Sequence, residues 1–328
     1  MGADRKARVD LCGCRAPSRW RCERCTEAGA EHLACSRSCL EKHWCKRHGR
    51  THEPSIGART RHQQALQNDA GESNWHSFAG HRARVTGLLR TLQRGEGLCV
   101  LGAGNGNDLD LGALVREFGE VHLVDLDGAA LERAQARAPA PFASSVVLHG
   151  DVDLTGLLDG IERWGDDDRA LFARAEEVAA AVAARLGRTF DVVLSSCVLS
   201  QLCAPFTRVL ARRPEEWRAL MALVGRTHFQ LMARLLRPGG TGVALGDIYY
   251  GPAAAHAATA LTWASLGRRA QAALRGAVMR LRDPHFLAQL LAGPELRELV
   301  AGARLSEPWL WQVEQAAMLV YAVIFQRS

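Results

Sequence analysis

Residues 98–108 read LCVLGAGNGND, and this stretch decides the fold of the 328-residue chain. Its first four residues are apolar, as expected for a short strand buried on both faces of a parallel sheet. Every second residue from Gly102 to Gly106 is then glycine, and helix-like sequence follows from Leu109. Such a turn lets backbone amides approach a ligand closely, and the start of the following helix favours negative or polar groups. The stretch therefore predicts a nucleotide-like cofactor.

An acidic residue supports this interpretation. Asp125 lies nineteen residues after Gly106, at the end of a second short apolar segment, VHLVD. A carboxylate at such a strand tip typically accepts hydrogen bonds from ribose hydroxyls. Asp127 follows two residues later, where we expect the N-cap of the next helix, although the two acids could exchange roles. A strand that ends in an acidic residue, nineteen residues after Gly106, argues against a glycine-rich turn that binds no ligand.

The glycine spacing separates two classes of cofactor. A dinucleotide-binding turn requires G-x-G-x-x-G, but its third glycine position holds Asn107 counted from Gly102 and Leu109 counted from Gly104. The spacing G-x-G-x-G instead resembles the first motif of the class I S-adenosylmethionine-dependent methyltransferases. A nicotinamide-dependent enzyme is the alternative that this spacing disfavours.

Later segments resemble the same family in the same order. They are SVVLHGDV at residues 145–152, FDVVLSSC at 190–197, LRPGG at 236–240 before a fifth strand, and a closing pair of apolar segments at 309–313 and 318–326. The resemblance implies an α/β fold with a Rossmann-like, seven-stranded sheet and a terminal antiparallel hairpin. We expect this domain to span residues 74–328, with helical insertions at about 154–188 and 251–302.

The resemblance also implies where S-adenosylmethionine binds. Asp125 is the expected ribose ligand, Asp151 the acceptor for the adenine amino group, and Val152 a residue that packs against the ring. Gln201 is a further pocket candidate. The expected cofactor-binding residues are Gly102, Ala103, Gly104, Asn105, Gly106, Asp125, Leu126, Asp151, Val152, Ser196 and Cys197.

The catalytic residues are less clearly marked. Methyl transfer from a sulfonium depends mainly on positioning the acceptor, and a general base is needed only if the acceptor must lose a proton. The sequence shows no pair of carboxylates and no His–Asp pair in a pattern typical of acid–base catalysis. The candidates are His228, Asp247 and Tyr249, and a structural role is the alternative for each. No Asn-Pro-Pro-Tyr tetrad follows residues 190–197, which argues against the enzymes that methylate amino groups of nucleic-acid bases, and no proline precedes Cys197, so the motif of the cytosine C5 nucleophile is absent as well.

The N-terminal residues 1–62 are expected to form a separate zinc module, followed by a polar linker at 63–73. Seven of the ten cysteines fall between Cys12 and Cys45, and such clustering in a cytosolic chain indicates metal more often than disulfides. With few apolar residues present, metal binding would supply the folding energy. Four ligand pairs suit two tetrahedral Zn²⁺ ions: Cys12 and Cys14, Cys22 and Cys25, Cys35 and Cys39, and His48 and His52.

Residues 34–44, ACSRSCLEKHW, resemble the second half of a MYND zinc finger. The resemblance implies a cross-braced module. One zinc would be held by Cys12, Cys14, Cys35 and Cys39, and the other by Cys22, Cys25, His48 and His52. The first pair is C-x-C where the family has C-x2-C, the final family Cys is His52 here, and one residue is inserted after Trp44. Cys45 or His43 therefore remains an alternative ligand of the second zinc.

The charge and the apolar runs limit the partners and the compartment. The net charge is +6, and residues 1–62 hold 14 Lys and Arg against 7 Asp and Glu, which is the whole basic excess. This excess of positive charge is typical of a protein that binds nucleic acid or an acidic protein. It is equally explained if the cationic side chains balance the negative charge of zinc-bound thiolates. The sequence begins without an apolar leader, and the run at 316–325 is too short to span a bilayer. We expect a cytoplasmic protein that does not bind membranes.

The sequence therefore predicts methyl transfer with S-adenosylhomocysteine as the product. MYND-like fingers usually bind proteins or peptides, so the expected acceptor is a peptide or protein recruited partly by the zinc module. The first alternative is a small metabolite or natural product, with the module as a structural cap. An RNA acceptor and a non-catalytic zinc-finger adaptor are the others.

Overall fold

The computed structural model describes residues 8–10, 20–21, 31–34, 55–92, 95–159, 168–210, 213–252, 262–263, 280–313 and 316–328. The chain divides into two compact units, Met1–Ser55 and Ile56–Ser328. In the first unit, β3 (Glu31–Ala34) pairs with both β1 (Arg8–Asp10) and β2 (Trp20–Arg21). All eight predicted zinc ligands lie outside the described residues, so the zinc module remains a prediction.

The second unit is built on one sheet, with the strand order β10-β11-β8-β7-β4-β5-β6. Neighbouring strands from β8 to β6 are parallel, β11 is antiparallel to β8, and β10 is antiparallel to β11. β9 (Val300–Leu305) also pairs with β11. This arrangement confirms the predicted Rossmann-like sheet with a terminal antiparallel hairpin. The strands on the main path are β4 (Leu98–Leu101), β5 (Val121–Val124), β6 (Val146–His149), β7 (Phe190–Ser195), β8 (Leu236–Pro252), β10 (Trp309–Val313) and β11 (Ala316–Arg327).

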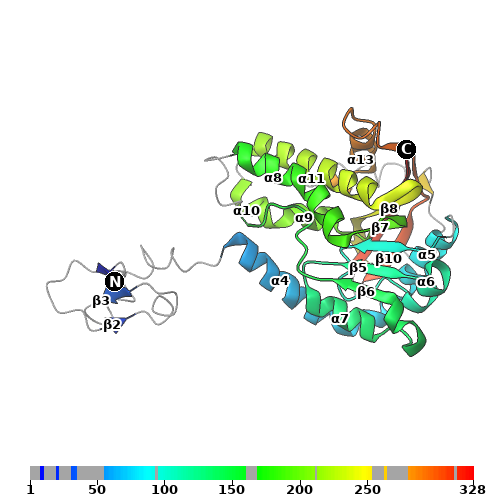
Figure 1. Cartoon of the computed structure of the whole chain (residues 1–328), viewed down its shortest axis with the longest axis horizontal. Helices are drawn as coiled ribbons and strands as arrows, with labels where there is room; N and C mark the ends of the chain where they lie inside the picture. Colours follow the sequence, from blue (N-terminus) through cyan, green and yellow to red (C-terminus); the bar gives the residue numbers. More distant parts are fainter. Residues whose placement is uncertain are drawn as a thin grey trace. The chain divides into compact units, whose positions relative to one another are not determined.

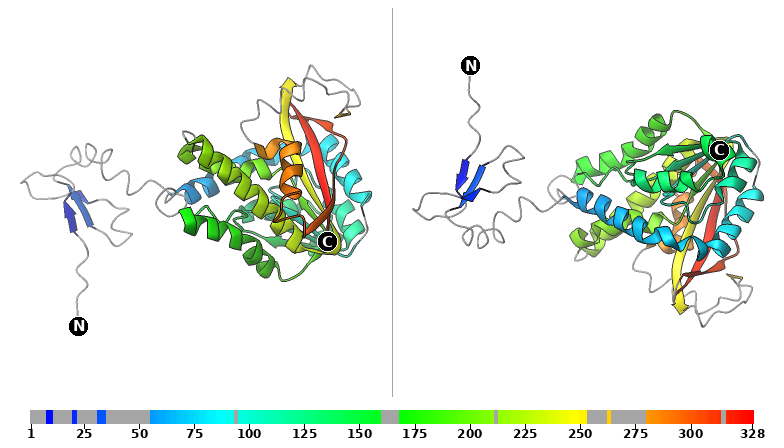
Figure 2. Two further views of the ribbon diagram at one scale, coloured as in Figure 1. Left: turned by 90° about the horizontal axis from the view of Figure 1, so that it is seen from above. Right: turned by 90° about the horizontal axis from the view of Figure 1, so that it is seen from below.

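Helices cover both faces of this sheet (Figures 1 and 2). Successive strand residues point to opposite faces, so Leu98 and Val100 of β4 join one hydrophobic core while Cys99 and Leu101 join the other. The first core contains α5 (Ala79–Arg90), α6 (Leu111–Phe118) and α7 (Gly128–Ala136). The second contains α8 (Asp168–Leu186), α11 (Pro214–Leu235) and α13 (Pro284–Leu291).

Shorter segments complete the second unit. The short α-helices are α9 (Leu199–Cys203) and α10 (Thr207–Leu210), and the 3-10 segments are η2 (Glu72–His76), η3 (Ala140–Ser145), η5 (Ala204–Phe206) and η7 (Arg280–Arg282). α8 occupies the predicted insertion at 154–188. The described part of the insertion at 251–302 contains α13 and the start of β9, so it is not helical throughout. Within the described ranges, no helix has the length and apolar content needed to cross a bilayer.

The boundary between the two units differs from the predicted one. α4 (Ile56–Gly71) is a sixteen-residue helix that begins the second unit, so residues 63–73, predicted as a linker, lie in α4 and η2. Only Ile56 and Gly57 of α4 are buried. A helix held mainly by polar contacts lacks the apolar periodicity by which a sequence reveals one, which explains the difference.

The close packing of β11 on β8 depends on Gly242. A Cβ added there would lie 2.2 Å from the ring of Phe325, whereas a Cβ added at Gly87 in α5 meets nothing within 4 Å. We expect Gly242→Ala to lower the free energy of unfolding by about 1–3 kcal/mol, and Gly87→Ala to raise it by about 0.5–1 kcal/mol. Urea unfolding followed by tryptophan fluorescence measures both, and wild-type stability of Gly242→Ala would contradict this packing.

Candidate cofactor site

The glycine-rich turn adopts a backbone that side chains disfavour. Gly102, Gly104 and Gly106 have φ angles of 72°, 48° and 63°, which glycine adopts without steric cost. Gly102 also lies against Val198, where an added Cβ would come within 2.5 Å of the valine Cβ. Its N–H donates to the carbonyl oxygen of Val124 at 2.9 Å. The first glycine is thus fixed between the ends of β5 and β7.

The carboxylate of Asp125 is tied to this turn. One oxygen accepts the N–H of Gly104 at 2.8 Å and the other accepts the N–H of Asp127 at 2.9 Å. Asp125 is buried, and burial raises its pKa while these two hydrogen bonds oppose the shift. Asp127 caps α7 by accepting the N–H of Ala130 at 3.2 Å, which confirms the predicted N-cap. The two acids therefore differ in position and partners.

A cavity of about 150 Å³ lies beside Asp125. Of the predicted cofactor residues, five line it; Ala103, Asn105 and Gly106 are buried elsewhere in the turn, and Ser196 and Cys197 lie just before the lining residue Val198. Gln201, the further candidate, also lines it. The full wall consists of Thr60, Gln64, Asn68, Gly102, Gly104, Asp125, Leu126, Val152, Asp153, Leu154, Thr155, Leu158, Val198, Gln201, Leu202 and Pro205.

In the loop after β6, Asp153 lines the cavity and Asp151 does not. Asp151 has a φ of 54° and an exposed side chain, and it lines a neighbouring groove. The carboxylate of Asp153 accepts the N–H and hydroxyl of Thr155 at 2.8 and 2.6 Å and the N–H of Leu158 at 2.9 Å. The predicted adenine ligand therefore differs from the acid in the wall, because the strained backbone at Asp151 turns that side chain outward.

A polar cluster, defined here as Asp108, Ser196, Asp247 and Arg282, adjoins the cavity through the segment before Val198. The hydroxyl of Ser196 donates to Asp108, and Arg282 approaches Asp247 to 3.9 Å. Burial raises the pKa of Asp247, opposed by Arg282. Burial raises the pKa of the Cys197 thiol, and the negative charges of Asp247 and Asp108 raise it further.

The three catalytic candidates lie in different surroundings. Asp247 belongs to the polar cluster. His228 is fully buried on α11, with Nε2 2.8 Å from the hydroxyl oxygen of Ser195, and it does not line the cavity. The backbone of Tyr249 pairs with Met318 in the β8–β11 ladder, and its side chain is outside the described part of the structure. Neither Asp247 nor His228 lines the cavity, and the two differ in that Asp247 lies beside Arg282 in the polar cluster whereas His228 is buried in the core.

Several lining residues escaped the sequence prediction. Thr60, Gln64 and Asn68 come from α4, at intervals of four residues that bring them to one helix face. That spacing is the signal that could have found them, although polar residues at such intervals are common on exposed helices.

Comparisons with known proteins were made for the whole chain. No protein-family model matches the sequence, and no curated protein matches it. Among solved structures, a methyltransferase from Anabaena variabilis described as S-adenosylmethionine-dependent is 14% identical, with a TM-score of 0.39 over 80% of this chain and 95% of that one. The N-methyltransferase NodS from Bradyrhizobium japonicum is 17% identical, with a TM-score of 0.35 over 75% and 95% of the two chains.

A third solved structure is CalS10, an amino pentose methyltransferase from Micromonospora echinaspora. It is 19% identical, with a TM-score of 0.32 over 55% of this chain and 62% of that one. Scores and identities this low carry no argument about activity. The fold assignment rests on the strand order and on the burial of alternating strand residues described above.

The burial of His228 predicts a pH-dependent stability. Burial lowers the pKa of His228 to about 4, whereas an unfolded-chain histidine titrates near 6.5. Below that pH the unfolded chain binds a proton that the folded chain does not, so stability is lost as the pH falls toward 4. Between about pH 7.5 and 5, His228→Gln should lose about 2 kcal/mol less stability in urea unfolding than the wild type. Equal losses would contradict the neutral, buried histidine.

Proposed function

We propose that the second unit is an S-adenosylmethionine-dependent methyltransferase, and that the cavity beside Asp125 receives the adenosine part of this cofactor. One observation carries the proposal: a buried carboxylate at the tip of β5 is fixed to a glycine-rich turn and faces a cavity. Ligands bind at the carboxyl ends of strands in open parallel sheets, where this carboxylate lies.

The chemistry of the cavity suits an adenosine group. Leu126, Val152 and Leu154 supply apolar surface for a planar base, and Asp125 has carboxylate oxygens for the ribose hydroxyls. Ligand sites of this kind are mostly apolar with a few fixed polar groups. Asp125 is already oriented by two backbone amides, so no side-chain ordering is required when a hydroxyl binds.

The polar cluster is the proposed acceptor side of the site. Bound S-adenosylmethionine would supply a methyl group activated by a positively charged sulfur. Asp247 is the proposed base, because it is the carboxylate on β8 that lies in the polar cluster, and burial raises its pKa although Arg282 opposes this shift. Ser196 and Asp108 would orient the acceptor with their hydroxyl and carboxylate groups, which a hydrogen bond already joins. Tyr249, two residues beyond Asp247 along β8, stays a second candidate, and His228 serves packing in this proposal.

The proposed acceptor is a peptide or protein that the N-terminal unit recruits. Seven of the ten cysteines lie between Cys12 and Cys45, and in this proposal they belong to a MYND-like module that binds two Zn²⁺. The alternative is a small metabolite bound at the polar cluster, with the N-terminal unit as a cap. Methyl-labelled S-adenosylmethionine and a lysate separated into protein, peptide, RNA and small-molecule fractions distinguish them. Label in a protein or peptide fraction supports the proposal, label among small molecules supports the alternative, and no label in any fraction counts against both.

The cofactor assignment is tested by Asp125→Asn. Loss of the charge should weaken S-adenosylhomocysteine binding at least tenfold, because hydrogen bonds to charged groups contribute about 1.5–3 kcal/mol. Glu132→Gln, which removes an exposed acid from α7, serves as the matched control and should bind like the wild type. Isothermal titration calorimetry measures Kd, and thermal unfolding verifies that both variants are folded. Equal Kd values for wild type and Asp125→Asn would contradict the ribose assignment.

A further inference from the structure

One face of α4 forms a wall of the cavity. Thr60, Gln64 and Asn68 lie four residues apart and all line it, as expected for positions stacked on one side of a helix. The hydroxyl of Thr60 is used within the helix, donating to the carbonyl oxygen of Ile56 at 2.7 Å. The amide of Gln64 makes no hydrogen bond to any residue that the structure describes. An unused amide in a cavity wall is available for a ligand.

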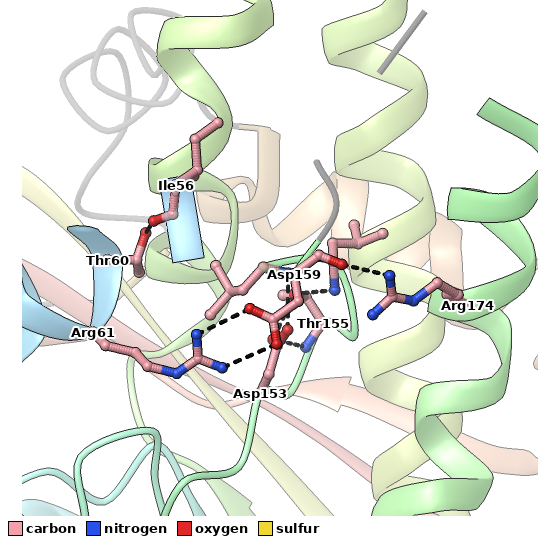
Figure 3. A network of polar contacts seen from close by, with 9 residues as sticks. Ile56, Thr60, Arg61, Asp153, Thr155, Asp159 and Arg174 are labelled. Atoms are coloured by element: carbon pink, nitrogen blue, oxygen red, sulfur yellow. Dashed lines mark hydrogen bonds and ion pairs between the residues drawn. The ribbon is translucent and has the colours of Figure 1, made fainter. Parts of the chain in front are cut away.

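Polar contacts hold α4 at both rims of the cavity. At its start, Arg61 pairs with Asp159 at 3.1 Å (Figure 3), and Gly57 lies so close that an added Cβ would be 2.8 Å from the carbonyl oxygen of Leu158. The loop after β6 that carries these partners forms one rim. α4 therefore begins on the adenine side of the proposed site.

The end of α4 is held by the other rim. The amide of Asn68 donates to the carboxylate of Asp127 at 2.8 Å, and the amide of Asn105 donates to the carbonyl oxygen of Asn68 at 2.5 Å. Asn107 likewise donates to the carbonyl oxygen of Gly71 at 2.8 Å. α4 thus spans from the loop after β6 to the glycine-rich turn, across the cavity.

α4 buries little apolar surface for a helix of this length. Only Ile56 and Gly57 are buried, and the Arg61–Asp159 pair is 38% and 66% exposed, so solvent screens it. Segments with few buried apolar contacts open at low free-energy cost. The cavity volume of about 150 Å³ is also below the ~300–1,000 Å³ typical of small-ligand sites. The docked helix thus leaves a small cavity, and release of α4 would enlarge it.

We propose, resting on the proposed function, that α4 is a strap that binds the cofactor. The helix releases the cavity to admit the ligand and then docks over it, with the amide of Gln64 in direct contact with the bound cofactor. Asn68 is a positioning residue, because it joins the strap to Asp127 and, through Asn105, to the glycine-rich turn. This assigns a binding role to a segment whose sequence resembles a linker.

Hydrogen exchange with and without saturating S-adenosylhomocysteine tests the strap in the full-length protein. We expect amides of α4 to exchange at least tenfold more slowly with the ligand, while those of α8, which lies on the other side of the loop after β6, serve as the internal reference. Protection of residues 125–126 and 152–158 without any change in α4 would overturn the proposal and leave the proposed function intact.

Four variants on one helix test the roles of the two side chains. Gln64→Ala should weaken S-adenosylhomocysteine binding about tenfold, and the exposed neighbours Gln63→Ala and Gln67→Ala should bind like the wild type. Asn68→Ala should raise the exchange rate of α4 amides in the absence of ligand and should speed ligand release in stopped-flow measurements. Wild-type binding by Gln64→Ala, or unchanged exchange and release in Asn68→Ala, would contradict the assigned role. Failure of the wild type to bind would instead overturn the proposed function together with the strap.

Discussion

The hydrogen bond from the N–H of Gly104 to the carboxylate of Asp125 is the interaction on which the site depends. A buried carboxylate is costly unless it is hydrogen-bonded, and here the glycine-rich turn and the start of α7 each supply one backbone amide. The Asp125 carboxylate thereby fixes the backbone of the glycine-rich turn beside the cavity. The three glycines have positive φ angles, and Gly102 leaves room for Val198, three residues after the end of β7. A side chain at any of these glycines would alter the geometry of the acid.

The cavity and the polar cluster both include residues of the segment that follows β7 or ends it. Val198 and Gln201 line the cavity beside Asp125. Ser196, two residues before Val198, belongs to the polar cluster and is followed by Cys197. Cys197 has a φ of 50°, an uncommon conformation that is found preferentially at functional sites. From Ser196 to Val198 the chain thus passes from the proposed acceptor side of the site to the proposed cofactor side. α4 lines the cofactor side and is also the element that follows the N-terminal unit along the chain.

The sequence predicts those parts of the fold that apolar pattern controls. β4 is found where an uninterrupted apolar run indicates a buried strand, and β5 where a mostly apolar one does. The terminal hairpin is found at the two apolar segments 309–313 and 318–326, and Asp127 caps α7 as expected. α4 was not predicted because polar contacts hold it, and these leave no periodic apolar signal. Asp151 and Asp153 are two residues apart, and only the backbone conformation of the loop decides which one enters the cavity wall. The zinc ligands lie outside the described residues and remain predictions.

A crystal structure of the full-length protein with S-adenosylhomocysteine tests the central claim most directly. The account predicts the ribose hydroxyls within hydrogen-bond distance of the Asp125 carboxylate, with the base between the loop after β6 and α4. Ligand bound elsewhere, for example in the groove between Arg174 and Arg185 on α8, or a ribose that makes no contact with Asp125, would contradict it.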